Sequence, residues 1–187
     1  ARILQVNASG EIMAIDSCYK EYLSRDEFVY HLLHGMRGGV PQYIFRRQVL
    51  VDRGGFVSFP KAWASDDATA VMMAEHGVVT SQEHLVRFRW SDINISGDSN
   101  LIAEKIIARL QHYEWLKTNL KPINVIDEKS NFLHKNIDLY LHVFNKTVLI
   151  SHLKRIPFMR KIECFRIIYL NKQMSIKDKI SVFKHSI

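Results

Sequence analysis

Residues 54–77 read GGFVSFPKAWASDDATAVMMAEHG, and this stretch carries most of what the sequence says about the fold. The glycines Gly54-Gly55 and the later Phe59-Pro60 pair keep the chain in a loop. Ser65 then precedes a run from Asp66 to His76 that predicts a helix. Gly77 is the residue type that commonly ends one. The stretch is therefore a loop that enters a helix at a pair of acids.

The acid pair, Asp66 and Asp67, has two interpretations. Carboxylates in a first helical turn are stabilised by free backbone N–H groups and by the helix dipole, so the pair could simply cap the helix. Adjacent helical residues point about 100° apart, so one acid could cap while the other faces a cleft. A carboxylate in a cleft with a like charge beside it can act as a general base.

Residues on either side of the acid pair are candidates for substrate contacts. Trp63 is wide enough to stack on a sugar ring, although it could equally be a core anchor. Arg87 and Arg89 share one face of a predicted strand over residues 85–90. That arginine pair could face a phosphate, or it could be a solvated strand face.

The remaining pattern predicts alternating strands and helices. Residues 2–15 predict a hairpin that turns at residues 7–10, and Ser24 with Glu27 predicts a capping box. The helix after Ser24 should bury Phe28, Leu32 and Leu33 and end at Gly35. A short strand is predicted over residues 42–45, and further strands over 78–80 and 85–90. Helices are predicted over 48–53, 101–120, 132–150, 157–170 and 175–183.

The order of these motifs resembles the later part of the family 2 glycosyltransferases of the GT-A fold. The resemblance rests on Phe45-Arg46-Arg47, Gly54-Gly55-Phe56, Ser65-Asp66-Asp67, Gly77, and Arg89-Trp90-Ser91 through Ile95-Ser96. The form Phe-Pro-x-Ala-Trp-x-Ser-Asp-Asp-Ala-Thr looks like enzymes that build bacterial surface polysaccharides. The resemblance implies an α/β fold: a partial, Rossmann-like GT-A domain over residues 1–120. A basic helical extension over residues 121–187 would follow it.

The resemblance also implies roles for residues. The second acid of the pair usually removes the proton of the acceptor hydroxyl, so the base role falls on Asp67, with Asp66 as its neighbour or the cap. Asp66 as the base stays open. Trp63, Arg87, Arg89 and Ser91 become the expected substrate-binding residues of a hexosyltransferase-like enzyme. It would use a nucleotide-sugar donor and a glycan or lipid-linked acceptor.

The N-terminal half of the family pattern is missing from this sequence. That half holds the nucleotide site and a DxD-type motif for a divalent metal, Mg or Mn, which neutralises the leaving diphosphate. Asp16-Ser17-Cys18 does not replace that motif, so no metal site is expected in this fragment. We expect the chain to begin just after the metal motif and to be inactive alone.

Charge is distributed unevenly along the chain. The net charge is +7, and residues 117–187 carry 14 Lys or Arg against 5 Asp or Glu. The basic and apolar mixture at residues 154–169 suits a helix on an anionic membrane surface, and the alternative is a helical cap with its basic face in water. The second functional hypothesis is a non-catalytic module whose tail contacts nucleic acid, a membrane or a partner protein.

Other sequence features limit the choice of protein class. There is no apolar run long enough for a transmembrane helix, and two distant cysteines make neither a disulfide framework nor a zinc site. No RNA-binding motif of the RRM type is present, so nucleic acid is not the expected partner. We expect a cytoplasmic protein, with peripheral attachment to the inner face of the cell membrane as the alternative.

Overall fold

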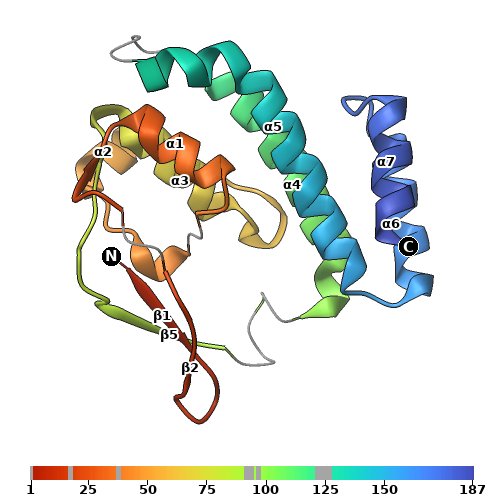
Figure 1. The fold of residues 1–187 in the computed structure, drawn as a ribbon, viewed down its shortest axis with the longest axis horizontal. Coiled ribbons are helices and arrows are strands. Elements are labelled where there is room, and N and C mark those ends of the chain that lie inside the picture. Colours follow the sequence, from red (N-terminus) through yellow and green to blue (C-terminus); the bar gives the residue numbers. More distant parts are fainter. Residues whose placement is uncertain (1, 17–18, 37–38, 91–94, 96–97, 121–127) are drawn as a thin grey trace. The chain divides into compact units, whose positions relative to one another are not determined.

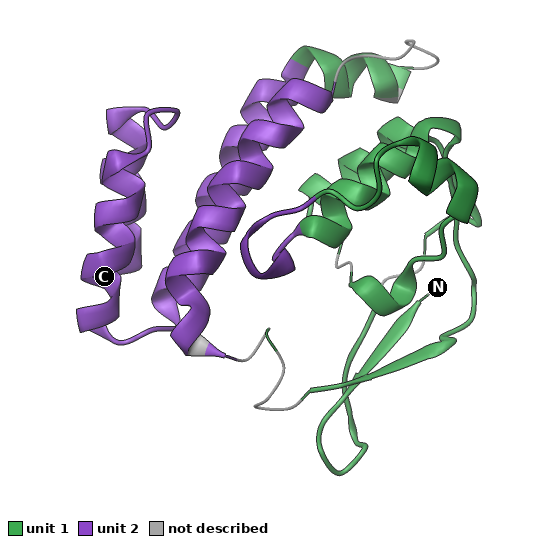
Figure 2. Cartoon of the chain, turned by 180° about the vertical axis from the view of Figure 1, so that it is seen from behind, with its two compact units in different colours: residues 1–57, 65–97, 122–135 green, residues 58–64, 98–121, 136–187 purple. Residues whose placement is uncertain are grey.

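The computed structural model of the chain describes residues 2–16, 19–36, 39–90, 95, 98–120 and 128–187. Its contacts divide the chain into two compact units (Figure 2). Unit 1 comprises residues 1–57, 65–97 and 122–135, and unit 2 comprises residues 58–64, 98–121 and 136–187. Both helices and a mixed sheet are present, so the expected α/β class is confirmed at that level.

Unit 1 contains all the described strands. Its elements are β1 (Ile3–Val6), β2 (Ile12–Ile15), β3 (Tyr22–Leu23), α1 (Arg25–Leu33), η1 (Val40–Gln42), α2 (Arg47–Asp52), α3 (Ser65–Met73), η3 (Ala74–His76), β4 (Val78–Val79) and β5 (Val86–Arg89). The main sheet has the order β2-β1-β5 (Figure 1). A separate two-stranded sheet pairs β3 with β4 antiparallel.

The hairpin of β1 and β2 forms as the sequence predicts. Gly10 has a φ of 91° and donates its N–H to the carbonyl of Asn7 at 3.1 Å, which closes the turn. The third strand, β5, pairs with β1 in parallel, with Leu4 opposite Arg87. A parallel pair needs a long crossover, and here the chain between β1 and β5 contains β2 and helices α1 to α3.

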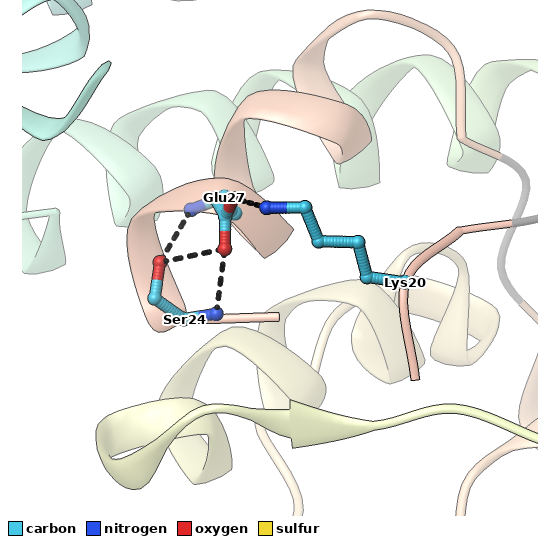
Figure 3. Close-up of polar contacts among 3 residues, drawn as sticks. All are labelled: Lys20, Ser24 and Glu27. Atoms are coloured by element: carbon cyan, nitrogen blue, oxygen red, sulfur yellow. Dashed lines mark hydrogen bonds and ion pairs between the residues drawn. The ribbon is translucent and has the colours of Figure 1, made fainter. Parts of the chain in front are cut away.

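Helix α1 begins at the predicted capping box (Figure 3). The Ser24 hydroxyl accepts the N–H of Glu27 at 3.2 Å, and the Glu27 carboxylate accepts the N–H of Ser24 at 3.2 Å. Lys20 adds an ion pair to the other Glu27 oxygen at 2.8 Å. The helix buries Phe28 and Leu32 and packs against α3. Apolar spacing and capping therefore agree in this segment.

Unit 2 is helical. Its elements are η2 (Pro60–Ala62), η4 (Ser99–Leu101), α4 (Ile102–Asn119), the larger part of α5 (Glu128–Lys154), α6 (Phe158–Leu170) and α7 (Ile176–Ser186). Its core gathers buried residues from all four α-helices and the segments that join them: Ile102, Ile106, Leu110, Leu149, Leu153, Ile156, Cys164, Ile168, Met174 and Val182. Apolar residues at a helical period explain why these helices pack on one another.

One predicted element is wrong. Residues 42–45 form no strand, because Pro41 lies in the 3₁₀ turn η1, where Tyr43 donates its N–H to the Val40 carbonyl at 3.3 Å. Tyr43 does have an extended backbone, with a φ of −96° and a ψ of 133°, but none of the described strands pairs with it. An apolar, extended tetrapeptide needs a neighbouring strand edge to become part of a sheet.

The C-terminal helices confirm the predictions closely, except that α5 extends beyond residues 132–150 at both ends. The expected domain boundary at residue 120 stays a prediction. By contacts alone, α4, which we expected in the first domain, belongs to unit 2 with α6 and α7. Among the described residues, no helix combines the length and apolar character needed to cross a bilayer.

Candidate functional site

The acid pair lies in the first turn of α3, as predicted. Asp67 is 9% exposed, whereas Asp66 is half-buried. The predicted helix end is also present, because Gly77 adopts a φ of 87° after η3. The first turn of a helix carries partial positive charge, which favours a carboxylate there even when it is shielded from water.

A hydrogen-bonded brace ties the preceding loop to this helix. The Thr69 hydroxyl donates to the Ser65 carbonyl at 2.6 Å and accepts the backbone N–H of Val57 at 3.0 Å. Gly54 and Gly55 have φ values of 86° and 88°, which only glycine adopts readily. This turn directs the chain toward the hydrogen bond between Val57 and Thr69. The glycine turn therefore has a structural function in positioning the start of α3.

Two motifs that carry the family resemblance meet within unit 1. The rings of Phe45 and Phe56 pack edge to face with centroids 6.1 Å apart. Phe45 also stacks on Tyr43 at 5.8 Å. The aromatic-Arg-Arg segment and the Gly-Gly-Phe turn are therefore packed together through their aromatic residues.

Tyr43 is a member of the site that the sequence analysis missed. Burial raises the pKa of its phenol well above the usual range, and the negative charges of Asp67 and Asp66 raise it further. Asp16 adds a smaller effect in the same direction. The phenol therefore stays protonated and can donate a hydrogen bond in an acidic environment. Its position in a supposed strand gave no signal of this role.

A cavity of about 270 Å³ lies beside the hairpin, in unit 1. Its walls include Arg2, Asp16, Tyr19 and Gln42. The Arg2 guanidinium donates to the Asp16 carbonyl at 2.9 Å, and the Asp16 carboxylate accepts the Gln42 amide at 2.7 Å. Asp16 thus both lines the cavity and influences Tyr43. The cavity presents charged and hydrogen-bonding groups of the kind that bind a polar small molecule.

The predicted arginines lie on β5, in unit 1. Arg87 and Arg89 are exposed and alternate with the half-buried Val86 and Phe88, so the predicted shared face is confirmed. Ser91 lies outside the described residues. Of the expected site residues, Asp66 and Asp67 share α3, and Arg87 and Arg89 share β5. A phosphate-binding role for the arginines stays a prediction.

Trp63 belongs to unit 2, where it lies against cations and an imidazole. Lys105 Nζ is 4.7 Å from the centre of a Trp63 ring, and the guanidinium carbon of Arg109 is 5.8 Å away. His152 packs edge to face on the indole at 5.8 Å. These contacts are cation–π and aromatic interactions, which suit a structural anchor. Stacking of Trp63 on a sugar stays a prediction.

The loop around Trp63 has an unusual backbone. Lys61, Ala62 and Ala64 have φ values of 54°, 54° and 66°, a region that costs residues with a Cβ about 1–2 kcal/mol each. Strain of this kind is maintained only where surrounding contacts enforce it, and it gathers near functional segments. Neither lysine nor alanine signals a left-handed backbone, so the sequence gave no indication of it.

Within the described residues, no group of three or more His, Cys, Asp or Glu side chains is arranged to hold a metal ion. The acid pair could accept a proton, and the polar cavity lined by Asp16 could hold a hydroxylated ligand. No family model, curated protein or solved structure matches the chain.

Proposed function

We propose that this chain is the acceptor-side part of an inverting glycosyltransferase of the GT-A, family 2 type. It would move a sugar from a nucleotide-sugar donor to a glycan or lipid-linked acceptor in the cytoplasm. The observation that supports this most is Asp67, which is shielded from water in the first turn of α3 next to a second carboxylate. A shielded carboxylate with a like charge beside it has the environment of a general base.

The proposed chemistry needs little from this chain beyond a base and a binding surface. The Asp67 carboxylate removes the proton of an acceptor hydroxyl, and the oxygen attacks the anomeric carbon. The bond to the nucleotide diphosphate breaks, and the sugar is transferred with inversion. The Tyr43 phenol, kept protonated by burial and by the charges of Asp67 and Asp66, is a candidate hydrogen-bond donor to the ligand. A general base of this kind contributes about 10²- to 10⁴-fold in rate.

The resemblance implies a divalent metal, and the described residues bring together no group of three or more His, Cys, Asp or Glu side chains that could hold one. The acids of the site, Asp16, Asp66 and Asp67, are not among any group that could hold a metal within the described part of the chain. No step in this chain is therefore assigned to a metal.

Donor use by the product of the complete reading frame tests the proposal. That protein should transfer or hydrolyse one member of a panel of nucleotide sugars, and EDTA should abolish the reaction until Mg²⁺ or Mn²⁺ is restored. A reading frame with no strand-rich start and no DxD-type motif upstream of this chain would contradict the proposal. So would a folded full-length product inert toward every donor.

A second candidate function is a binding module without chemistry. It is favoured by the charge of residues 154–187, which carry nine Lys or Arg against two Asp or Glu. Nucleic acid binding predicts a mobility shift of random RNA or DNA that weakens steeply with salt. Absence of a shift at low salt would exclude that form of the module.

A further inference from the structure

Helix α6 carries an apolar stripe that the core of unit 2 does not use. Phe158, Ile162 and Tyr169 are between 51% and 74% exposed. They lie four and seven residues apart, so at 100° per residue they share one side of the helix. Cys164 and Ile168, on another side of α6, fill the core of unit 2.

Helix α7 repeats the same arrangement. Ile176, Ile180, Phe183 and Ile187 are between 49% and 76% exposed and are spaced by four, three and four residues. Val182 occupies a different side of the helix and is fully buried in the core. Each helix therefore has one side for the unit 2 core and a second apolar side in solvent.

The two stripes join into one surface. Helices α6 and α7 contact each other within unit 2, and the rings of Phe165 and Phe183 lie 4.6 Å apart. Phe165 is half-buried and lies on the same side of α6 as Phe158 and Tyr169. The α6–α7 face is defined by the exposed residues Phe158, Ile162, Tyr169, Ile176, Ile180, Phe183 and Ile187.

Basic residues border the α6–α7 face, and acids avoid it. Arg166, Lys177 and Lys184 are exposed and follow apolar or aromatic residues of the two helices. Asp178 is turned toward other partners, because it pairs with His142 at 2.9 Å. Around α6, Arg166 lies about 60° from Tyr169, whereas Glu163 lies about 120° from it. The face is therefore apolar at its centre and positive at its edges.

Of the surfaces that could cover this face, an anionic lipid bilayer fits its chemistry best. Phe, Ile and Tyr side chains flanked by Lys and Arg are the composition of helices that lie in a membrane interface. Long basic side chains can place their stems on the apolar region and their charges at the headgroups. A second copy would bring two positive rims together, which like-charge repulsion opposes. The attraction between basic residues and an anionic leaflet acts in the other direction.

We propose that the α6–α7 face docks the protein peripherally on membranes that carry anionic lipids, with α6 and α7 parallel to the surface. This docking is a property of unit 2 and does not depend on the glycosyltransferase proposal. If that proposal also holds, docking would bring the enzyme to the surface where a lipid-linked acceptor lies.

Co-sedimentation with vesicles tests the proposed docking. The protein should sediment with phosphatidylcholine vesicles that contain about a third phosphatidylglycerol, and much less with pure phosphatidylcholine. Added salt should weaken the binding. The double variant Ile176→Ser, Ile180→Ser should bind at least about tenfold more weakly, because two exposed side chains no longer enter the apolar layer.

The matched control is the double variant Ile12→Ser, Ile15→Ser, which changes two isoleucines on β2 of unit 1 that are also exposed, at 60% and 59%. It should bind vesicles like the unmodified protein, and circular dichroism should show that both variants are folded. Equal binding by the two double variants would overturn the proposal. Failure to bind anionic vesicles at low salt would also overturn it, as would concentration-dependent dimerisation that the α7 variant abolishes while vesicle binding is absent.

Discussion

Two buried histidines in unit 2 should make the free energy of unfolding depend on pH. Burial lowers the pKa of His112 to about 3, and the nearby Arg109 charge lowers it further. Burial likewise lowers the pKa of His152 to about 4, with Arg109 and Lys105 adding to the effect. Both imidazoles are therefore largely neutral in the folded protein above about pH 5.

The unfolded chain binds protons at these histidines near pH 6.5, whereas the folded protein does not. The stability of unit 2 should therefore be complete above about pH 6.5 and fall as the pH drops toward 4. Each histidine contributes about 1.4 kcal/mol per pH unit. Urea unfolding between pH 7 and 4.5 would measure this slope.

The variant His112→Phe keeps an aromatic ring beside Phe59 and Phe144 but removes the titrating group. Its free energy of unfolding should fall less steeply as the pH drops. The slope should be smaller by about 1.4 kcal/mol per pH unit, which is the contribution of one histidine. The control His76→Phe changes an exposed histidine of unit 1 and should leave the slope unchanged. If His112→Phe shows the same slope as the unmodified chain, the assignment of acid sensitivity to this ring is wrong.

Single residues also show where the sequence was informative for the site. The acid pair could be found because Asp-Asp at a helix start has a local pattern. Tyr43 and the left-handed Lys61 could not be found, because burial beside acids and backbone strain arise from contacts distant in sequence. Proximity of that kind depends on tertiary structure, which a single sequence does not encode locally.

At the level of elements, the substitution of Gly77 should have a large effect on stability. It ends the helical segment of α3 and η3 with a φ of 87°, and a Cβ there would lie 2.6 Å from the Leu23 carbonyl of β3. The substitution Gly77→Ala should therefore lower the free energy of unfolding by at least about 3 kcal/mol, since both the backbone and the β3–β4 pair resist it.

Gly10 is the matched control for that substitution. It has a similar φ of 91°, but a Cβ there would meet no atom within 4 Å. Gly10→Ala should cost only the left-handed backbone energy, about 1–2 kcal/mol. Chemical denaturation of the two variants measures the difference. Equal losses would mean that the contact with Leu23 contributes nothing.

Elements with local signals were the ones predicted well. The capping box at Ser24, the turn at Gly10 and the 3.6-residue period of α4 each need only neighbouring residues to form. The strand predicted over residues 42–45 failed because strand formation needs a partner edge. The parallel pairing of β5 with β1 was not predicted for the same reason.

At the scale of the whole molecule, the sequence indicated the α/β class but not how helices group into units. Helix α4 looks like the end of an α/β domain in sequence order, yet Ile102, Ile106 and Leu110 are buried with α5 and α6 residues such as Leu149 and Ile168. Apolar periodicity shows that a helix has a buried side, but does not identify what covers it.

Turnover by variants of the acid pair tests the central claim most directly. In the product of the complete reading frame, Asp67→Asn should reduce kcat by about 100-fold or more, because the base is lost while the side-chain shape remains. Asp66→Asn should reduce kcat by a smaller factor. Asp52→Asn, the same change at an exposed residue of α2, should leave kcat unchanged. Unchanged thermal unfolding of all three variants would show that the fold is intact. Wild-type turnover by a folded Asp67→Asn protein would contradict the account.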